Sequence, residues 1–156
     1  MWHSCTCATQ RSGHDVRSLT GTLVLWAPET GAFTTLSTSG SGGWANGPSS
    51  NFGYRDFGSA VMYDGRKILL VGGNQTPRTR KAEVINLDTG AGASWRYVDS
   101  MGVARRQLNA TLLADGRVLV TGGSTAAGFN TSPSDSKVLA AEVWDPMTER
   151  WSQWDV

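Results

Sequence analysis

The sequence has few of the side chains that most often bind metals or act as nucleophiles. Among 156 residues it contains two cysteines, Cys5 and Cys7, and two histidines, His3 and His14. Their spacing does not match a zinc site, in which about two to four residues separate paired ligands. Cys5 and Cys7 are also too close in sequence to form an unstrained disulfide. We therefore expect no metal site at this end of the chain, and an irregular leader over residues 1–21.

Charge is also sparse, and it is balanced. Charged residues make up 17% of the chain, with 14 Lys and Arg against 13 Asp and Glu, which gives a net charge of +1. A nucleic-acid partner is not expected, because such a domain needs a concentrated basic face. No apolar run approaches the length of about 18 residues that a membrane-spanning helix needs. The first 20 residues also lack the apolar stretch of a signal peptide.

Glycine and tryptophan are abundant instead. The chain has 19 glycines and seven tryptophans, and the glycine content is well above the usual share of about 7%. Apolar runs are short and rich in Val and Leu, and few segments have the periodicity of a helix. The length suits one ordinary domain. The composition therefore predicts an all-β protein with glycine-rich turns.

An internal repeat organises most of the chain. The two clearest copies read FGSAVMYDGRKILLVGG over 57–73 and LNATLLADGRVLVTGG over 108–123, and their double glycines are 50 residues apart. Each copy predicts an apolar strand, an Asp-Gly hairpin turn, a second apolar strand and a glycine pair. The glycine pair lets the chain leave the strand sharply, since it has no Cβ to clash.

A second strand pair follows in each unit. AEVINLD at 82–88 precedes WRYV at 95–98, and AEVWDP at 141–146 precedes WSQW at 151–154. Glu83 and Glu142 recur with the repeat, so we interpret them as structural hydrogen-bonding residues. A truncated upstream copy over 23–33 has only this second strand pair.

A four-stranded unit of about 50 residues, with a double glycine and a late tryptophan, is typical of the kelch blade of a β-propeller. A generic β-sandwich is the alternative, but it does not explain the recurrence. We predict a kelch-type propeller segment of about two and a half four-stranded antiparallel blades. The expected parts are a leader at 1–21, the last two strands of a blade at 22–36, a Gly/Ser-rich loop at 37–54, a blade at 55–98, a linker at 99–105 and a blade at 106–154.

Two segments carry a family resemblance. YRDFGSAVMYD at 54–64 and ARRQLNATLLADG at 104–116, each followed by its double glycine, resemble the propellers of galactose oxidase-like and glyoxal oxidase-like proteins. The resemblance covers about residues 23–154. It implies a seven-bladed propeller. It also implies a secreted copper radical oxidase that converts alcohols or aldehydes and releases hydrogen peroxide. An extracellular location and a carbohydrate, small alcohol or aldehyde ligand follow from the resemblance alone.

The copper motif of that family is not found in this sequence. The resemblance implies two tyrosine and two histidine ligands, one pair being a Tyr-His dipeptide two residues after an arginine. Here the matching arginine is Arg105, and Gln107 and Leu108 stand where Tyr-His is expected. Asp56 and Phe57 hold the equivalent places in the preceding unit. Neither pair combines an imidazole with a phenolate for copper, so we expect no copper and no catalysis in this chain by itself.

Two functions remain open after this test. The first is a non-catalytic scaffold for binding and assembly, with further propeller blades or copies of itself as partners. The second is a piece of a copper radical oxidase whose ligand-bearing blades lie outside this chain. In a propeller, the loops that enter the innermost strands crowd one face near the axis. The ligand-facing candidates are therefore Tyr54, Arg55, Asp56, Arg105, Arg106 and Gln107, with Trp44 from the Gly/Ser-rich loop.

Overall fold

The protein folds into three four-stranded antiparallel sheets, each with its strands in sequential order. The computed structural model describes residues 15–19, 22–27, 32–37, 43–53, 55–73, 78–126 and 136–154. Sheet 1 contains β1 (Asp15–Leu19), β2 (Thr22–Ala27), β3 (Ala32–Ser37) and β4 (Gly43–Asn46). Sheet 2 contains β5 (Ser59–Asp64), β6 (Lys67–Val71), β7 (Ala82–Asn86) and β8 (Trp95–Val98). Sheet 3 contains β9 (Asn109–Leu112), β10 (Val118–Thr121), β11 (Ala141–Asp145) and β12 (Arg150–Trp154).

The expected all-β class is confirmed. One short 3₁₀ helix, η1 (Leu87–Gly92), occupies the predicted turn between β7 and β8. In the part of the chain that the structure describes, no helix is long and apolar enough to cross a membrane.

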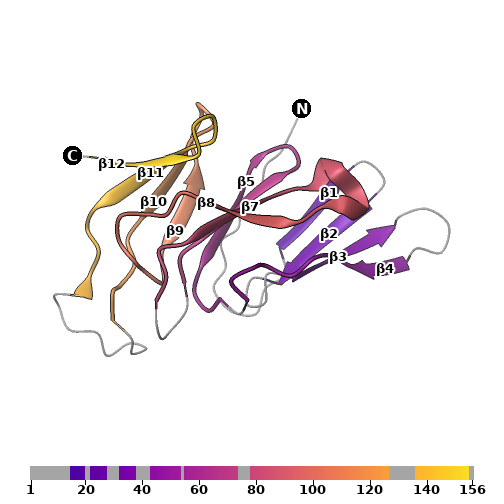
Figure 1. Ribbon diagram of the computed structural model, residues 1–156, viewed down its shortest axis with the longest axis horizontal. Helices are drawn as coiled ribbons and strands as arrows, with labels where there is room; N and C mark the ends of the chain where they lie inside the picture. Colours follow the sequence, from indigo (N-terminus) through magenta and orange to yellow (C-terminus); the bar gives the residue numbers. More distant parts are fainter. Residues whose placement is uncertain are drawn as a thin grey trace.

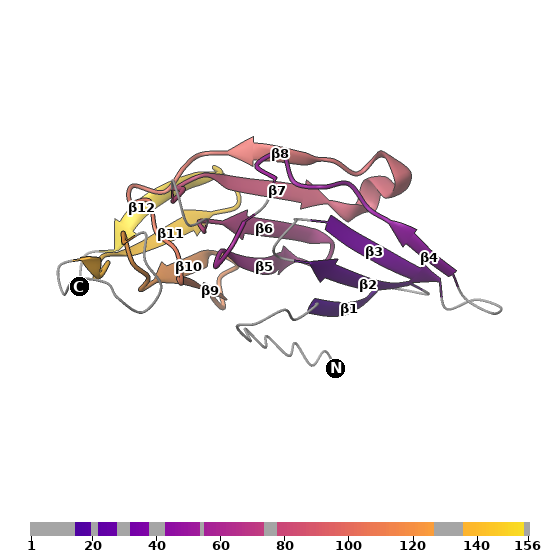
Figure 2. The same cartoon turned by 90° about the horizontal axis from the view of Figure 1, so that it is seen from below.

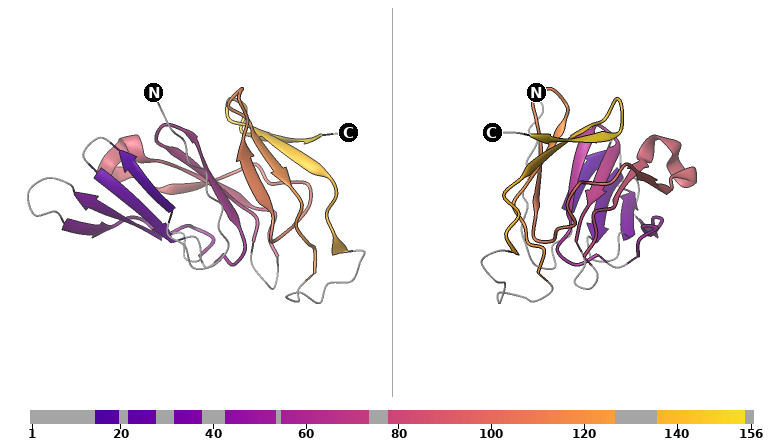
Figure 3. Two further views of the ribbon diagram at one scale, coloured as in Figure 1. Left: turned by 180° about the vertical axis from the view of Figure 1, so that it is seen from behind. Right: turned by 60° about the vertical axis from the view of Figure 1, so that its left-hand side comes forward.

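The three sheets stand in a row, with sheet 2 in the middle (Figure 1). From below, the first strand of each sheet lies on the lower side of the molecule, and β8 and β12 lie on the upper side (Figure 2). The view from behind shows the same fan of sheets, with sheet 1 and sheet 3 at opposite ends (Figure 3). The first strands β5 and β9 of neighbouring sheets are in contact.

The glycine pairs turn the chain as the sequence predicts. Gly72 and Gly73 have φ angles of 64° and 94°, and Gly122 and Gly123 repeat them at 66° and 92°. These values lie in the left-handed region, which side chains with a Cβ disfavour. A Cβ on Gly73 would lie 2.7 Å from the carbonyl oxygen of Asp56. The glycines therefore allow the end of the second strand to pass close to the start of the first.

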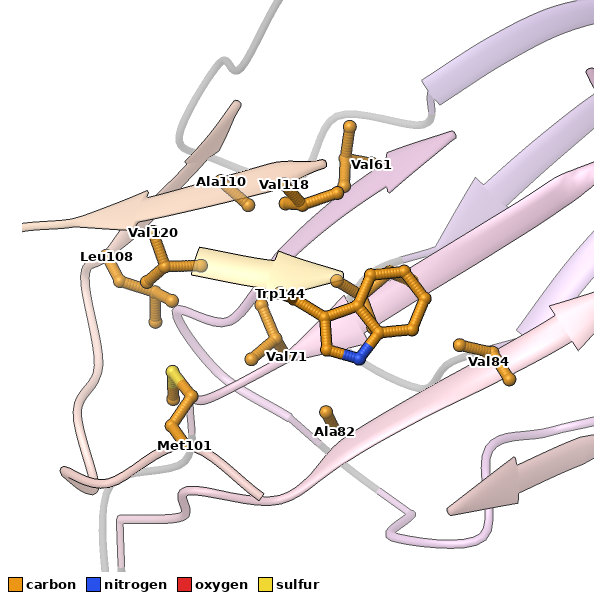
Figure 4. Packing of buried hydrophobic residues seen from close by; sticks show 11 residues of the cluster. Val61, Val71, Ala82, Val84, Met101, Leu108, Ala110, Val118, Val120 and Trp144 are labelled. Carbon is orange, nitrogen blue, oxygen red and sulfur yellow. The ribbon is translucent and has the colours of Figure 1, made fainter. Parts of the chain in front are cut away.

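Apolar side chains from two sheets form one core cluster (Figure 4). Val61, Leu69, Val71 and Val84 come from sheet 2, and Val118, Val120 and Trp144 come from sheet 3. Alternation along each strand directs these side chains to the same face. Such burial is worth about 1.5–3 kcal/mol for each large aliphatic side chain, so the two sheets form a single packed unit.

The other face of sheet 2 has a smaller cluster of its own. Ile68, Leu70, Ile85 and Trp95 are buried there. The Trp95 indole Nε1 donates to the carbonyl oxygen of Pro48, 3.1 Å away, in the segment that arrives from sheet 1. Both faces of sheet 2 are therefore covered.

The region before residue 55 differs from the sequence expectation. Residues 22–36 were expected to be the last two strands of a blade, but β2 and β3 are the two central strands of a complete four-stranded sheet. β1 lies within the expected leader, 1–21, and pairs with β2 from Asp15↔Trp26 to Leu19↔Thr22. β4 lies within the expected loop, 37–54, and pairs with β3. Backbone hydrogen bonds hold an edge strand, so it needs neither an apolar pattern nor a low glycine content.

Candidate functional site

The candidate residues lie at the end of the sheets where the first strands begin. Here the segments 55–58 and 105–108 lead into β5 and β9, and the glycine pairs close against them. The main chain joins the two segments, because the Gln107 amide donates to the Phe57 carbonyl at 2.8 Å. We call this the entry end. Of the candidates, Arg55, Asp56, Arg105, Arg106 and Gln107 belong to this end.

Arg55 is directed into sheet 2 and not toward solvent. It is 1% exposed, and its Nη1 donates to the carbonyl oxygens of Gly72 and Lys81, both at 2.9 Å. Its Nη2 donates to Glu83 Oε1 at 2.6 Å. Burial lowers the pKa of Arg55, while the hydrogen bond and charge of Glu83 act in the opposite direction. The Arg55 guanidinium, which comes before β5, therefore binds the main chain just after β6 and just before β7.

The Glu83 carboxylate also holds the segment that arrives from sheet 1. It accepts the amide of Asn51 at 2.8 Å and the amide of Phe52 at 3.1 Å. The Phe52 ring lies under the Arg55 guanidinium, 4.5 Å from the ring centroid, a favourable cation–π distance. Glu83 is fully buried. The two amides and the Arg55 guanidinium balance its negative charge.

Arg105 and Glu142 repeat this arrangement in sheet 3. Arg105 Nη1 donates to the carbonyl oxygens of Gly122 at 3.2 Å and Ala140 at 2.8 Å. Its Nη2 donates to Glu142 Oε1. The Arg105 residue is 0% exposed.

Glu142 in turn holds the linker from sheet 2 to sheet 3. Its Oε2 accepts the amide of Gly102 at 2.6 Å, and its Oε1 accepts the amide of Val103 at 3.3 Å. The interpretation of Glu83 and Glu142 as structural hydrogen-bonding residues agrees with this geometry. Arg55 and Arg105 are their partners, and their guanidinium groups contact protein atoms inside the sheets.

Arg106 belongs to the second entry segment, and its side chain packs against the first. It is fully buried, and its guanidinium carbon is 5.2 Å from the centroid of the Phe57 ring. Its main chain exchanges hydrogen bonds with Ser124 in both directions, at 3.1 and 2.9 Å. Asp56 and Gln107 are half-buried, which leaves them as the candidates with accessible surface at the entry end.

Phe57 and Gln107 share an unusual backbone conformation. Both have a φ of 56°, in the left-handed region that non-glycine residues seldom adopt. They occupy equivalent places in the two units, 50 residues apart like Arg55 and Arg105. The sequence alignment, which paired Asp56 with Gln107 and Phe57 with Leu108, is therefore wrong by one residue. The residue types Phe and Gln do not predict a positive φ. The 50-residue recurrence shows that the two positions correspond.

Two further candidates are not placed at the entry end. Trp44 lies in β4, where it pairs with Leu36 of β3. Tyr54 lies outside the described residues.

The described residues do not suit the copper site that the family resemblance implies. Leu108, in the expected histidine place, is 8% exposed and belongs to the apolar core cluster. Gln107, in the expected tyrosine place, offers an amide, a poor ligand for copper beside imidazole and thiolate. Within the described part of the chain, no three His, Cys, Asp or Glu side chains are grouped as metal ligands. His3, Cys5, Cys7 and His14 lie outside that part.

A hollow lies at the opposite end of the sheets, where the hairpin turns connect the strands. It is a cavity of about 470 Å³ between sheets 2 and 3. Tyr63, Lys67 and Arg96 line it from sheet 2, and Met147 and Glu149 line it from the turn between β11 and β12. In the sequence these five positions are ordinary strand and turn residues. Only the packing of the two sheets brings them together.

No protein-family model and no curated protein matches this chain. Solved structures do share its fold. A fungal alcohol oxidase of the AA5 family, in complex with copper, superposes with a TM-score of 0.73 over 86% of this chain, at 23% identity. YjhT superposes with a TM-score of 0.68 over 94% of this chain, at 16% identity. This chain spans 29% of the alcohol oxidase and 52% of YjhT, so it has the fold of a part of each.

Replacement of Glu142 tests the buried pair. Glu142→Gln leaves the Arg105 guanidinium buried without a carboxylate, which is expected to lower the free energy of unfolding by about 3–5 kcal/mol. Glu149→Gln is the matched control, because Glu149 pairs with Arg96 at the surface and an exposed pair contributes about 1 kcal/mol or less. Urea denaturation measures both. Equal losses in the two variants would contradict the assigned role.

Tyr63 gives a prediction about pH. Burial, and then the nearby Glu149 carboxylate, raise the pKa of Tyr63 to about 12 from its ordinary value of 10.0. Because the folded-state pKa is the higher one, the stabilisation is present below a pH of about 10 and is lost as the pH rises through about 12. The difference in phenolate absorbance between the wild-type chain and Tyr63→Phe should therefore have its midpoint at about pH 12. A midpoint at the ordinary tyrosine value would contradict this environment.

Proposed function

We propose that this chain is part of a galactose oxidase-like kelch propeller and that, by itself, it is a non-catalytic scaffold for binding and assembly. Three kinds of observation support the proposal. The sheets superpose on parts of the two solved proteins above, and the buried Arg–Glu pairs recur with the 50-residue period. The residues at the matching copper-motif positions are also unsuitable as copper ligands.

The distribution of exposed apolar side chains carries the assembly part of the proposal. Five large apolar side chains are exposed among the described residues from 46 to 154, and four of them belong to sheet 3 and its loops. These four are Leu112, Leu139, Met147 and Trp154. Leu112 lies on the face that packs against sheet 2, beside its cross-strand partner Val118, and Met147 lines the cavity between sheets 2 and 3. Leu139 and Trp154 are therefore the two that a further blade could cover. In a propeller each blade packs both faces against its neighbours, and stacked repeats depend on such interfaces for stability. Sheet 3 is thus suited to receive a further blade.

The entry end carries the binding part of the proposal. Asp56 and Gln107 are the half-buried polar candidates there, and the neighbouring Arg106 is fully buried and packs against Phe57. A carboxylate and an amide form directed hydrogen bonds with hydroxyl groups. The ligand proposed for this end is a carbohydrate or a small alcohol or aldehyde, in keeping with the family resemblance. An extracellular location is part of the same proposal.

A second candidate function is a piece of a secreted copper radical oxidase. The observation that favours it is the fold shared with a copper-containing alcohol oxidase, of which this chain spans less than a third. In that case other parts of a longer protein would supply the copper ligands. The segments described here would supply the rigid sheets and the polar entry end.

Self-association tests the assembly proposal. Purified chain is expected to form oligomers or aggregates as its concentration rises, because the exposed apolar side chains of sheet 3 have no further blade to pack against. The double variant Leu139→Lys with Trp154→Lys should shift the light-scattering mass toward the monomer. Tyr97→Lys, which alters an equally exposed ring of sheet 2, should not. A monodisperse wild-type monomer, with a melting temperature above about 65 °C that does not depend on concentration, would contradict the proposal.

Copper loading separates the two candidate functions. The scaffold proposal predicts no turnover above a copper-only blank when the isolated chain is given copper and assayed for hydrogen peroxide with galactose, glyoxal or simple alcohols. Turnover at stoichiometric bound copper would overturn it. Turnover that appears only when the neighbouring segments of a longer protein are supplied would support the oxidase-fragment candidate.

A further inference from the structure

We call the end of the sheets where the hairpin turns lie the turn end. The cavity there has the size and composition of a small-molecule site. Its volume of about 470 Å³ lies within the range of about 300–1,000 Å³ that is common for such sites. Part of its wall is apolar, since the Tyr63 ring, Pro146 and Met147 line it and are not fully buried. Polar side chains complete the lining. The cavity lies at the opposite end of the sheets from the entry end.

The charges around this cavity are already paired. Lys67 Nζ donates to Asp64 Oδ2 at 3.0 Å. Arg96 donates from both terminal nitrogens to the two carboxylate oxygens of Glu149, with Nη1 at 2.7 Å from Oε2. This hydrogen bonding holds the pKa of Glu149 below its usual range. The two positive and two negative side chains of the lining balance one another, so the cavity has no net charge to attract a charged ligand.

Three neutral polar groups remain available in the same lining. The Tyr63 hydroxyl, the Ser94 hydroxyl and the Asn86 Nδ2 make no hydrogen bond within the described part of the chain, while the Asn86 Oδ1 accepts the Asp88 amide. The raised pKa of Tyr63 keeps its hydroxyl protonated across the physiological range. The ring is fixed by an edge-on contact with Trp144, 4.8 Å between centroids. The cavity therefore presents three neutral hydrogen-bonding groups, and the one on Tyr63 is held by a fixed ring.

We propose that this inter-sheet cavity binds a neutral polyhydroxylated molecule, a sugar or a linear polyol, through Tyr63, Asn86 and Ser94. Hydroxyl groups both donate and accept, so they match an amide donor and two hydroxyl groups at once. The C–H surface of the same ligand would contact Pro146 and Met147. The inference does not depend on the proposed function, because it uses the other end of the sheets and residues within this chain.

The ligand would also couple the two sheets. Arg96 belongs to β8 of sheet 2, and Glu149 belongs to the turn before β12 of sheet 3. The cavity is complete only when these sheets are packed together. A ligand bound there stabilises the packed arrangement by mass action.

Saturation-transfer NMR on the full chain tests the ligand class. The probes are D-glucose and D-galactose as sugars, sorbitol as a linear polyol, and glucuronate and glucosamine as charged analogues. At least one neutral probe should bind with a Kd on the order of millimolar, and the charged analogues should bind more weakly. A stronger signal from the hexoses assigns a sugar, and a stronger signal from sorbitol assigns a polyol. No transfer to any neutral probe, or tighter binding of the charged analogues, would overturn the proposal.

Variants then locate the site. Tyr63→Phe removes one hydroxyl and retains the ring, and it should weaken binding about 2- to 10-fold, the effect of one neutral hydrogen bond. Ser94→Ala alters an exposed residue and should weaken binding by a similar factor. Tyr97→Phe is the matched control, because Tyr97 lies on β8 outside the cavity lining. Wild-type affinity in both Tyr63→Phe and Ser94→Ala would overturn the assignment.

Oxidative footprinting of the wild-type chain needs no substitution, so a folding defect in a variant cannot affect its result. Met147 lines the cavity and is 89% exposed, so mild hydrogen peroxide should oxidise it to the sulfoxide readily. A saturating neutral probe should slow oxidation of Met147 and leave the rate at Met62, which is not in the lining, unchanged. An unchanged rate at Met147 with bound probe would place the ligand elsewhere and overturn the proposal.

Discussion

A buried ion pair between an arginine and a glutamate organises each of the two C-terminal sheets. Removing two charges from water is costly, and the cost is recovered only when the geometry is good and the remaining donors and acceptors are satisfied. Here each carboxylate accepts a guanidinium and two backbone amides, and each guanidinium reaches two carbonyl oxygens as well. Three segments meet at each pair, namely 51–55, Gly72 and 81–83 in sheet 2, and 102–105, Gly122 and 140–142 in sheet 3. The pair therefore holds the incoming linker and three strands in one arrangement.

Sheets 2 and 3 are joined differently at the entry end, where the buried pairs lie, and at the turn end. At the entry end the pairs bring neighbouring first strands together, so that Gly73 donates to the Arg105 carbonyl at 2.9 Å and Ala110 donates to Ser59 Oγ at 3.1 Å. Apolar packing around Trp144 then fills the space between the sheets. At the turn end there is no equivalent buried pair in the described residues. The sheets are joined there by the exposed Arg96–Glu149 contact, and a cavity remains beside it.

The repeat in the sequence predicts much of sheets 2 and 3. Double glycines, Asp-Gly turns and short Val- and Leu-rich runs are local signals, and they identify β5 to β12 with small differences at the ends. Local signals do not reveal β1 and β4, because an edge strand is held by its neighbour's backbone and tolerates polar residues and glycine. The same limit applies to the cavity, which exists only because turns from two sheets lie side by side.

The orientation of the arginines was the hardest feature to predict. A polar cluster near the start of the first strands is expected from the repeat, and Arg55, Asp56, Arg105, Arg106 and Gln107 belong to the entry end. Residue type does not tell whether a guanidinium is directed to solvent or into a sheet. Arg and Glu do recur together in the two units, and this joint recurrence fits a buried pair, since a buried charge needs a partner at a matching position.

Native-state hydrogen exchange at Gly102 and Val103 tests most directly whether the Arg105–Glu142 pair holds the linker. Both amides lie outside the strands, and their acceptor is the buried Glu142 carboxylate. They should exchange only through the same opening that releases strand amides such as Val120, and so with a similar free energy of opening. Exchange at the rate of an open loop, while the β9 to β12 amides stay protected, would contradict the account.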